Sequence, residues 1–274
     1  KAAESLISLT TKSITATNTV ILQTEVNGMA FVATRDSTFE IILKDGFKVE
    51  PGSTFVCGFH GLGEVGFLST AHLTRALDAE RVGFIKSDML PLFVSMENER
   101  LVLPFELYWY AEKKLVFLVP RFQPHSSEQW GWIDRLAEWI TASKFSESLL
   151  LGGLDASFKE DEEEMRCVPT SAYSDRLEKW SVPILEEGLF VAGPLALLLA
   201  ELEMREQAAL GLLTYATRGR PDPKSAATML EKINEVYGVE ANVEELLKES
   251  REIERLEKMR QSIEASDRSS DMFV

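Results

Sequence analysis

The sequence contains few of the residues from which disulfide frameworks and metal centres are built. Its 274 residues include two cysteines, Cys57 and Cys167, and three histidines. Neither cysteine belongs to a CxxC pair, so a disulfide framework or a structural zinc site is not expected. Cys57 lies in an apolar run and is predicted to be a small buried hydrophobic residue. This use of cysteine fits a reducing, cytoplasmic environment.

Long apolar runs and excess positive charge are also lacking. The longest apolar run covers residues 189–200, which is shorter than the roughly 18 residues expected of a membrane-spanning helix. The N-terminal residues do not form the apolar core of a signal peptide. The net charge is −15, which argues against a basic face for nucleic acid. We therefore expect neither a membrane nor a nucleic acid as partner.

Most of the chain alternates between apolar strand-like runs and amphipathic helix-like segments. Strands are predicted at 54–60, 81–88, 114–120, 148–155 and 208–217. Helices are predicted at 67–79, 128–143 and 242–266, and Trp132, Leu136 and Trp139 of the second fall at the spacing of a face that packs on the sheet. A turn followed by a helix is predicted at 189–207, and a loop followed by a helix at 218–238, where Gly238 is a C-cap signal. This alternation indicates an α/β fold with three layers, α/β/α, and a mostly parallel sheet covered by helices on both faces.

The predicted domain organisation has three parts. Residues 1–50 are expected to form a β-rich extension packed on the core, because Asn27-Gly28 between two apolar runs is a strong hairpin signal and a third strand follows. Residues 51–238 are the α/β core. Residues 239–274 are predicted as a C-terminal helix, capped by Asn242 with Glu245, followed by a mobile tail.

A glycine turn follows the first core strand. Gly61, Gly63 and Gly66 form a GxGxxG pattern between a strand and a helix, which is the context of a dinucleotide site. Asp88, at the end of the next strand, is the corresponding candidate for a ribose-binding carboxylate. Glu64 inside the turn would repel a pyrophosphate, and a tight turn needs glycines even without a ligand. The structural interpretation is favoured, and a nucleotide- or nucleoside-binding enzyme is the alternative.

Other candidates for chemistry are sparse. His60, His125 and Asp155 each follow a predicted strand and are candidates for one polar cluster. No GxSxG nucleophile motif, HExxH, Walker A or EF-hand pattern is present. No cofactor and no metal are therefore expected. The charge run at 159–166 is predicted to be a solvated loop.

The last three residues are apolar although the segment before them is polar. Met272, Phe273 and Val274 end the sequence. Apolar residues on a mobile segment are candidates for an anchor that enters a pocket on a partner protein.

The order of several motifs resembles that of the proteasome assembly chaperone family, especially its archaeal members. The motifs are CGFHGLGEVG, LLLGGLD, CVPTSA, VAGPLALLL, LLTYATRGRPDPKSAATMLEKIN and NVEELLKESREIERL, between residues 54 and 256. The resemblance implies a sheet like that of purine nucleoside phosphorylases and a protein without catalytic activity. It also implies a ring-like homo-oligomer that binds the proteasome core particle.

The same resemblance gives the C-terminal residues a role. Some family members end in a hydrophobic residue, a tyrosine and any residue, and this tail docks between adjacent α subunits of the core particle. The matching positions here are Met272, Phe273 and Val274. Phenylalanine keeps the aromatic bulk of the tyrosine and lacks its hydroxyl.

Overall fold

The computed structural model describes residues 21–26, 29–34, 39–88, 94–97 and 99–256. The chain divides into two units, Lys1–Thr38 and Phe39–Val274. In the first, β1 (Ile21–Val26) and β2 (Met29–Thr34) pair antiparallel, and Val26 lies opposite Met29. This register confirms the hairpin predicted around Asn27-Gly28, although the two turn residues lie outside the described residues. The predicted packing of this segment on the core stays a prediction.

The second unit is built on an eight-stranded sheet with the order β11-β12-β10-β4-β9-β8-β5-β3. Five strands, β12, β10, β4, β9 and β5, run in one direction, and β11, β8 and β3 run against them. The strand bounds are β3 Phe39–Leu43, β4 Thr54–Gly58, β5 Glu80–Ser87, β8 Phe105–Tyr110, β9 Leu115–Pro120, β10 Glu147–Asp155, β11 Met165–Pro169 and β12 Ala209–Ala216.

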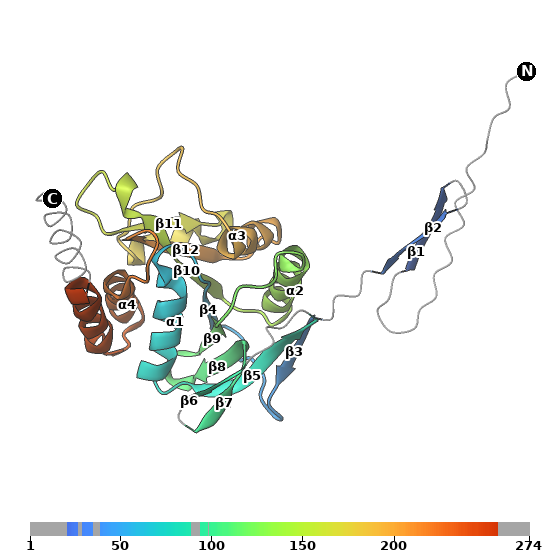
Figure 1. Cartoon of the computed structure of the whole chain (residues 1–274), viewed down its shortest axis with the longest axis horizontal. Helices are drawn as coiled ribbons and strands as arrows, with labels where there is room; N and C mark the ends of the chain where they lie inside the picture. The colour runs from blue at the N-terminus through green and yellow to red at the C-terminus, as the bar shows by residue number, and fades with distance from the viewer. Residues whose placement is uncertain (1–20, 27–28, 35–38, 89–93, 98, 257–274) are drawn as a thin grey trace, which may run out of the picture. The chain divides into compact units, whose positions relative to one another are not determined.

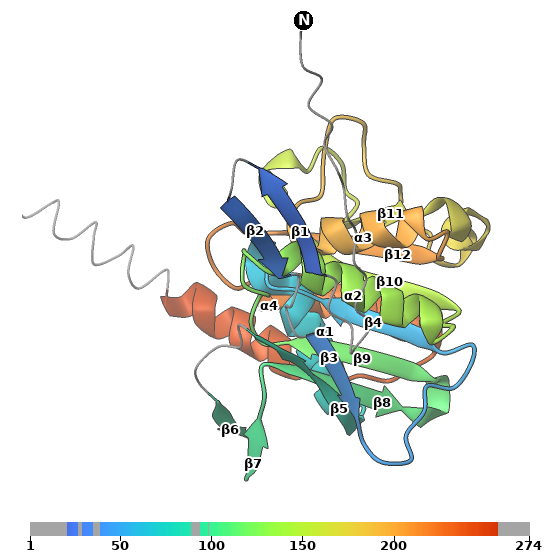
Figure 2. The same ribbon diagram turned by 90° about the vertical axis from the view of Figure 1, so that its right-hand side faces the viewer.

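Helices cover both faces of this sheet (Figure 1). One face packs against α1 (Val65–Ala76), α4 (Pro223–Tyr237) and the helical residues 244–256. The other face, which Figure 2 views directly, packs against α2 (Gln129–Ala142) and α3 (Pro194–Met204). Strands β4, β9 and β12 are buried along their whole length, as expected of strands covered by helices on both faces of the sheet. The predicted α/β/α architecture is confirmed.

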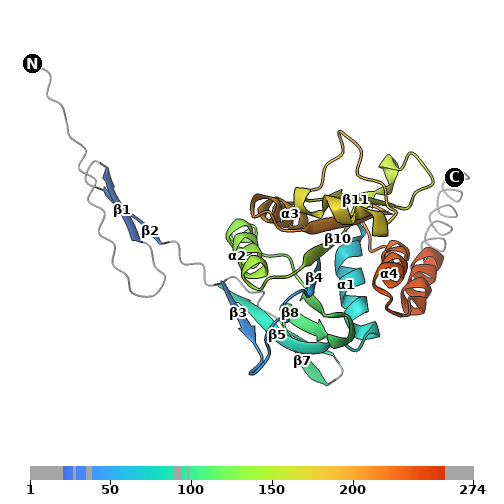
Figure 3. The same cartoon turned by 180° about the vertical axis from the view of Figure 1, so that it is seen from behind.

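Short elements complete the unit. The hairpin of β6 (Ser95–Glu97) and β7 (Arg100–Val102) projects from the sheet in Figure 2. Single 3₁₀ turns are η1 (Leu62–Glu64), η2 (Ala111–Lys113) and η3 (Ala156–Phe158), and η4 (Ser171–Lys179) is a longer 3₁₀ segment. Figure 3 shows the 244–256 helix beside α4.

Several helix ends follow directly from the sequence. Pro194 and Pro223 occupy first-turn positions of α3 and α4, where a missing N–H costs nothing. Gly238 ends α4 in the left-handed conformation with φ of 61°, which confirms the predicted C-cap. In α2, Trp132 and Leu136 are buried against the sheet, as their helical spacing predicts.

The charge run at 159–166 is a solvated loop only in part. Residues 160–164 are exposed, but the prediction was wrong for Arg166, whose side chain is 1% exposed in β11. Arg166 pairs with Asp161 at 2.7 Å and Glu186 at 2.5 Å, and its guanidinium lies over the Tyr215 ring. These two carboxylates offset the cost of burying a charge.

Candidate functional site

The glycine turn brings helix α1 into contact with the backbone of the sheet. A Cβ atom on Gly66 would lie 2.3 Å from the Leu151 carbonyl oxygen, and one on Gly58 would lie 2.1 Å from the Gly66 oxygen. Gly63 adopts φ of +62°, and a Cβ there would lie 2.7 Å from the Ala216 side chain. These distances leave no room for any side chain, so the glycines are needed for helix-to-sheet packing.

Polar groups of the protein itself surround the turn. Glu64 takes the N-cap position of α1 in a left-handed conformation with φ of 52°. Its carboxylate lies 3.8 Å from Nδ1 of His60, whose ring stacks on Phe67. His60 Nε2 donates to the Arg121 carbonyl at 2.9 Å. A carboxylate therefore lies beside the helix terminus at which a phosphate would bind.

The predicted partner of the turn, Asp88, is not brought to it. Asp88 follows β5, and two strands, β9 and β8, separate β5 from β4. Three strand spacings correspond to about 14 Å. The structure thus gathers Gly61, Gly63 and Gly66 and leaves Asp88 on a distant strand, an arrangement that does not favour a dinucleotide site.

The three residues of the second candidate cluster lie at or after the ends of neighbouring strands, as predicted. His60 and His125 come after β4 and β9, and Asp155 is the last residue of β10; these three strands are adjacent in the sheet. Each has a different partner, however. His125 Nδ1 lies 2.8 Å from the Ser127 hydroxyl, and Asp155 pairs with Arg218 at 2.6 Å while accepting from the Ser157 backbone N–H. The contacts are those of residues that fix loop backbone.

A buried carboxylate that the sequence reasoning missed lies on β8. Glu106 is 0% exposed and accepts hydrogen bonds from Arg81 at 2.9 Å, Arg100 at 2.8 Å and the Tyr108 hydroxyl at 2.7 Å. Burial raises the pKa of Glu106, but the bonds from Tyr108 and the two arginines outweigh it and hold the pKa below its ordinary value. A glutamate inside the aromatic run FELYWY was the available signal, because a buried acid requires partners.

Arg121 adds a third guanidinium to this cluster. It binds Glu97 through two hydrogen bonds of 2.9 and 3.0 Å, and its Nη2 lies 3.8 Å from Glu106. We call Arg81, Arg100, Arg121, Glu97, Glu106 and Tyr108 the Glu106 cluster.

The base of the C-terminal helix is held by several contacts. Asn242 Oδ1 accepts from the Glu244 backbone N–H at 2.8 Å, which confirms Asn242 as a cap, while the Glu245 carboxylate lies 3.6 Å from Nδ1 of His72. His72 of α1 is 3% exposed and donates through Nε2 to the Asn242 carbonyl at 2.6 Å. Leu246 is buried. The candidate partner-binding residues Met272, Phe273 and Val274 lie outside the described residues.

Two other features, a metal site and a membrane-spanning helix, are absent from the described part of the chain. No group of three or more histidine, cysteine, aspartate or glutamate side chains there could hold a metal ion. No helix in the same residues is long and apolar enough to cross a membrane.

Comparison with known proteins gives consistent matches. A family model described as the PAC2 family matches residues 55–260. An uncharacterized protein of Methanocaldococcus jannaschii is 26% identical over 200 residues, which is 72% of this chain and 80% of that protein. PbaA of Pyrococcus furiosus, an archaeal homologue of proteasome-assembly chaperone, has a similar structure with a TM-score of 0.70 at 24% identity, covering 84% of this chain and 100% of PbaA.

A second solved structure has the same fold. PbaB of Pyrococcus furiosus, an archaeal proteasome activator, has a TM-score of 0.66 at 22% identity, covering 81% of this chain and 98% of PbaB. At these identities the structural similarity establishes the fold.

Proposed function

Because the chain belongs to the PAC2 family, we propose that it is a proteasome-assembly chaperone that acts by binding and not by catalysis. The observation that carries this proposal is the family match over residues 55–260, which spans the sheet from β4 to the C-terminal helix. The descriptions of PbaA as a homologue of proteasome-assembly chaperone and of PbaB as a proteasome activator support it. Two free, buried cysteines fit the cytoplasmic location that we propose.

The proposed partner is the proteasome core particle, bound through its α subunits. The C-terminal residues Met272, Phe273 and Val274 would enter a pocket on the partner, with the Phe273 ring as the aromatic anchor. The helix that leads toward them has a fixed base, because Asn242 caps it and Leu246 is buried. A fixed base gives each tail a defined origin on the surface.

A homo-oligomer is the proposed working form. Several tails on one assembly would bind a ring of partner subunits with an avidity that exceeds the affinity of one tail. Large apolar side chains at the surface support self-association: Phe158, Ile184 and Phe190 are 54%, 57% and 81% exposed.

The proposal is tested by capture of purified proteasome α subunits. Four proteins are compared: the full chain, a chain lacking residues 272–274, Phe273→Ala and the control Trp130→Ala, which removes an exposed aromatic side chain of α2. We expect the full chain and the control to bind, and the other two to bind weakly or not at all.

Two outcomes would contradict parts of the proposal. If the full chain captures no α subunit, the chaperone function is wrong. If removing residues 272–274 leaves binding unchanged, binding occurs through another surface and the tail has no part in it. The mass of the full chain in solution, measured by light scattering, tests the homo-oligomer separately.

A further inference from the structure

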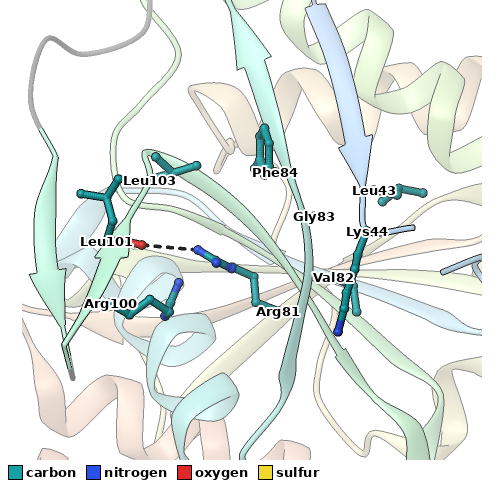
Figure 4. A pocket seen from close by; sticks show the side chains of 9 residues that line it. All are labelled: Leu43, Lys44, Arg81, Val82, Gly83, Phe84, Arg100, Leu101 and Leu103. Atoms are coloured by element: carbon teal, nitrogen blue, oxygen red, sulfur yellow. Dashed lines mark hydrogen bonds between the residues drawn. The ribbon is translucent and has the colours of Figure 1, made fainter. Parts of the chain in front are cut away.

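Two cavities meet at the Glu106 cluster, and Arg81 and Arg100 line both of them. The first, which we call the arginine pocket, has a volume of about 560 Å³ and lies between β3, β5 and β7 (Figure 4). Its wall combines these guanidinium groups and Lys44 with apolar side chains. The apolar side chains include Leu43, Phe84, Leu101 and Leu103.

The positions of the two guanidinium groups are fixed before any ligand binds. Arg81 extends from β5 toward β7, donating to the Leu101 carbonyl at 3.3 Å, and Arg100 lies beside it (Figure 4). Both donate through Nη1 to the same oxygen of Glu106. The Nη2 of Arg100 donates to Tyr108 at 2.8 Å. Such preorganisation lowers the entropic cost of binding an anion.

Charge counting leaves one positive charge of this cluster unmatched. The cluster has three arginines and two carboxylates. Arg121 is paired with Glu97, and Arg81 and Arg100 share Glu106, so these two guanidinium groups have one carboxylate between them. Within the described residues, Nε and Nη2 of Arg81 and Nε of Arg100 have no hydrogen-bond acceptor. This surplus is notable in a chain whose net charge is −15.

The second cavity, of about 540 Å³, is less suited to an anion. Arg75 and Arg121 also line it, but so do the carboxylates of Asp78, Glu97 and Glu249. None of the described residues that line the arginine pocket is acidic. Lys44 there already pairs with Glu80, so the available positive charge is that of Arg81 and Arg100.

We propose that the arginine pocket binds a small organic anion, whose oxyanion head pairs with Arg81 and Arg100 and whose apolar body packs against the leucine side chains. Paired guanidinium groups match the geometry of a carboxylate or a phosphate. The volume lies in the range of small-molecule sites, about 300–1,000 Å³. A carboxylate head would neutralise the single surplus charge, and a phosphate head would exceed it.

Calorimetric titration of the full chain tests the proposal with three probes: benzoate, phenyl phosphate and inorganic phosphate. We expect the chain to bind benzoate or phenyl phosphate, and the tighter of the two identifies the head group. Arg81→Gln and Arg100→Gln should each weaken that binding about tenfold or more, because each removes a charged hydrogen-bond donor. The control Arg135→Gln, which changes an exposed arginine of α2, should bind as the unchanged chain does.

A further variant separates a ligand site from a merely structural cluster. Leu101 lines the pocket, is 48% exposed, and contributes only its backbone carbonyl to the Arg81 contact. Leu101→Ala should therefore fold normally and weaken the organic probe while leaving inorganic phosphate unaffected. This variant keeps the test decisive if an arginine variant fails to fold.

Three results would overturn the proposal. The first is the absence of binding of benzoate and phenyl phosphate by the unchanged chain at millimolar concentration. The second is equal binding by the unchanged chain and by folded Arg81→Gln and Arg100→Gln. The third is inorganic phosphate binding as tightly as either organic probe, because the apolar wall would then contribute nothing.

Discussion

Replacing Gly66 by alanine tests whether the glycine turn serves packing. The new Cβ would lie 2.3 Å from the Leu151 carbonyl oxygen and 2.9 Å from the Phe59 carbonyl oxygen. Both oxygens belong to the main chain, Leu151 within β10 and Phe59 directly after β4, so neither can move as a flexible side chain would. Overpacking of this kind costs about 1–3 kcal/mol. Because the new Cβ would meet two backbone oxygens, we expect the clash in Gly66→Ala to cost about 3 kcal/mol.

A second effect opposes the clash. Alanine stabilises a helix relative to glycine by about 1 kcal/mol, and Gly66 lies in the first turn of α1. The net loss is therefore about 2 kcal/mol. For a chain of this size, each kcal/mol lowers the melting temperature by about 2–4 °C, so the expected decrease is about 4–8 °C.

Gly61→Ala provides the matched control. Gly61 is the first glycine of the same pattern, has an extended φ of −163°, and nothing lies within 4 Å of a Cβ atom there. Its substitution should change stability by less than about 0.5 kcal/mol. Thermal unfolding followed by circular dichroism compares both variants with the unchanged chain. An unchanged melting temperature for Gly66→Ala, or an equal loss for Gly61→Ala, would refute the packing argument.

Two further predictions concern the buried charge and the C-terminal helix. The pKa of Glu106 is lowered in the folded state. The ionised carboxylate therefore contributes fully to the free energy of unfolding above the pKa of an unfolded glutamate, about 4.3, and this contribution is lost as the pH falls through the folded pKa. Glu106→Gln should cost about 3–5 kcal/mol near neutral pH, and the difference in urea midpoint between variant and unchanged chain should shrink in acid. A constant difference would contradict this. Asn242→Ala should remove about 1 kcal/mol of helix stability and speed hydrogen exchange of the 244–250 amides, whereas Glu249→Gln should not.

The features that the sequence predicted well are those with local causes. Gly238 ends α4 because a left-handed residue is needed there, and Asn242 caps the last helix through a backbone N–H two residues later. The hairpin register of Val26 with Met29 follows from a two-residue turn. Each cause acts within a few residues, so the pattern alone is sufficient.

The features that the sequence did not reveal depend on distant partners. Arg166 is buried because Glu186, 20 residues later in the chain, pairs with it. Glu106 is buried because Arg81 and Arg100 come from other strands. Periodicity describes a single segment, so it predicts a solvated charge wherever the compensating charge lies elsewhere in the fold.

Strand order decides what the glycine turn can do. In a dinucleotide-binding fold the strand after the first helix pairs directly with the first strand, so its carboxylate lies beside the turn. Here α1 is followed by β5, with β9 and β8 between β5 and β4.

The place beside the turn is taken instead by the start of α4. Asp222 donates its backbone N–H to the Gly63 carbonyl at 2.8 Å, and its carboxylate accepts from the Thr217 and Ser225 backbone N–H groups. Burial raises the pKa of Asp222, but these bonds outweigh burial and keep the pKa below its ordinary value. Two carboxylates, those of Glu64 and Asp222, thus occupy the surroundings that a phosphate would need. The turn resembles a nucleotide site in sequence, but two of the protein's own carboxylates lie beside it, an arrangement that does not favour a bound phosphate.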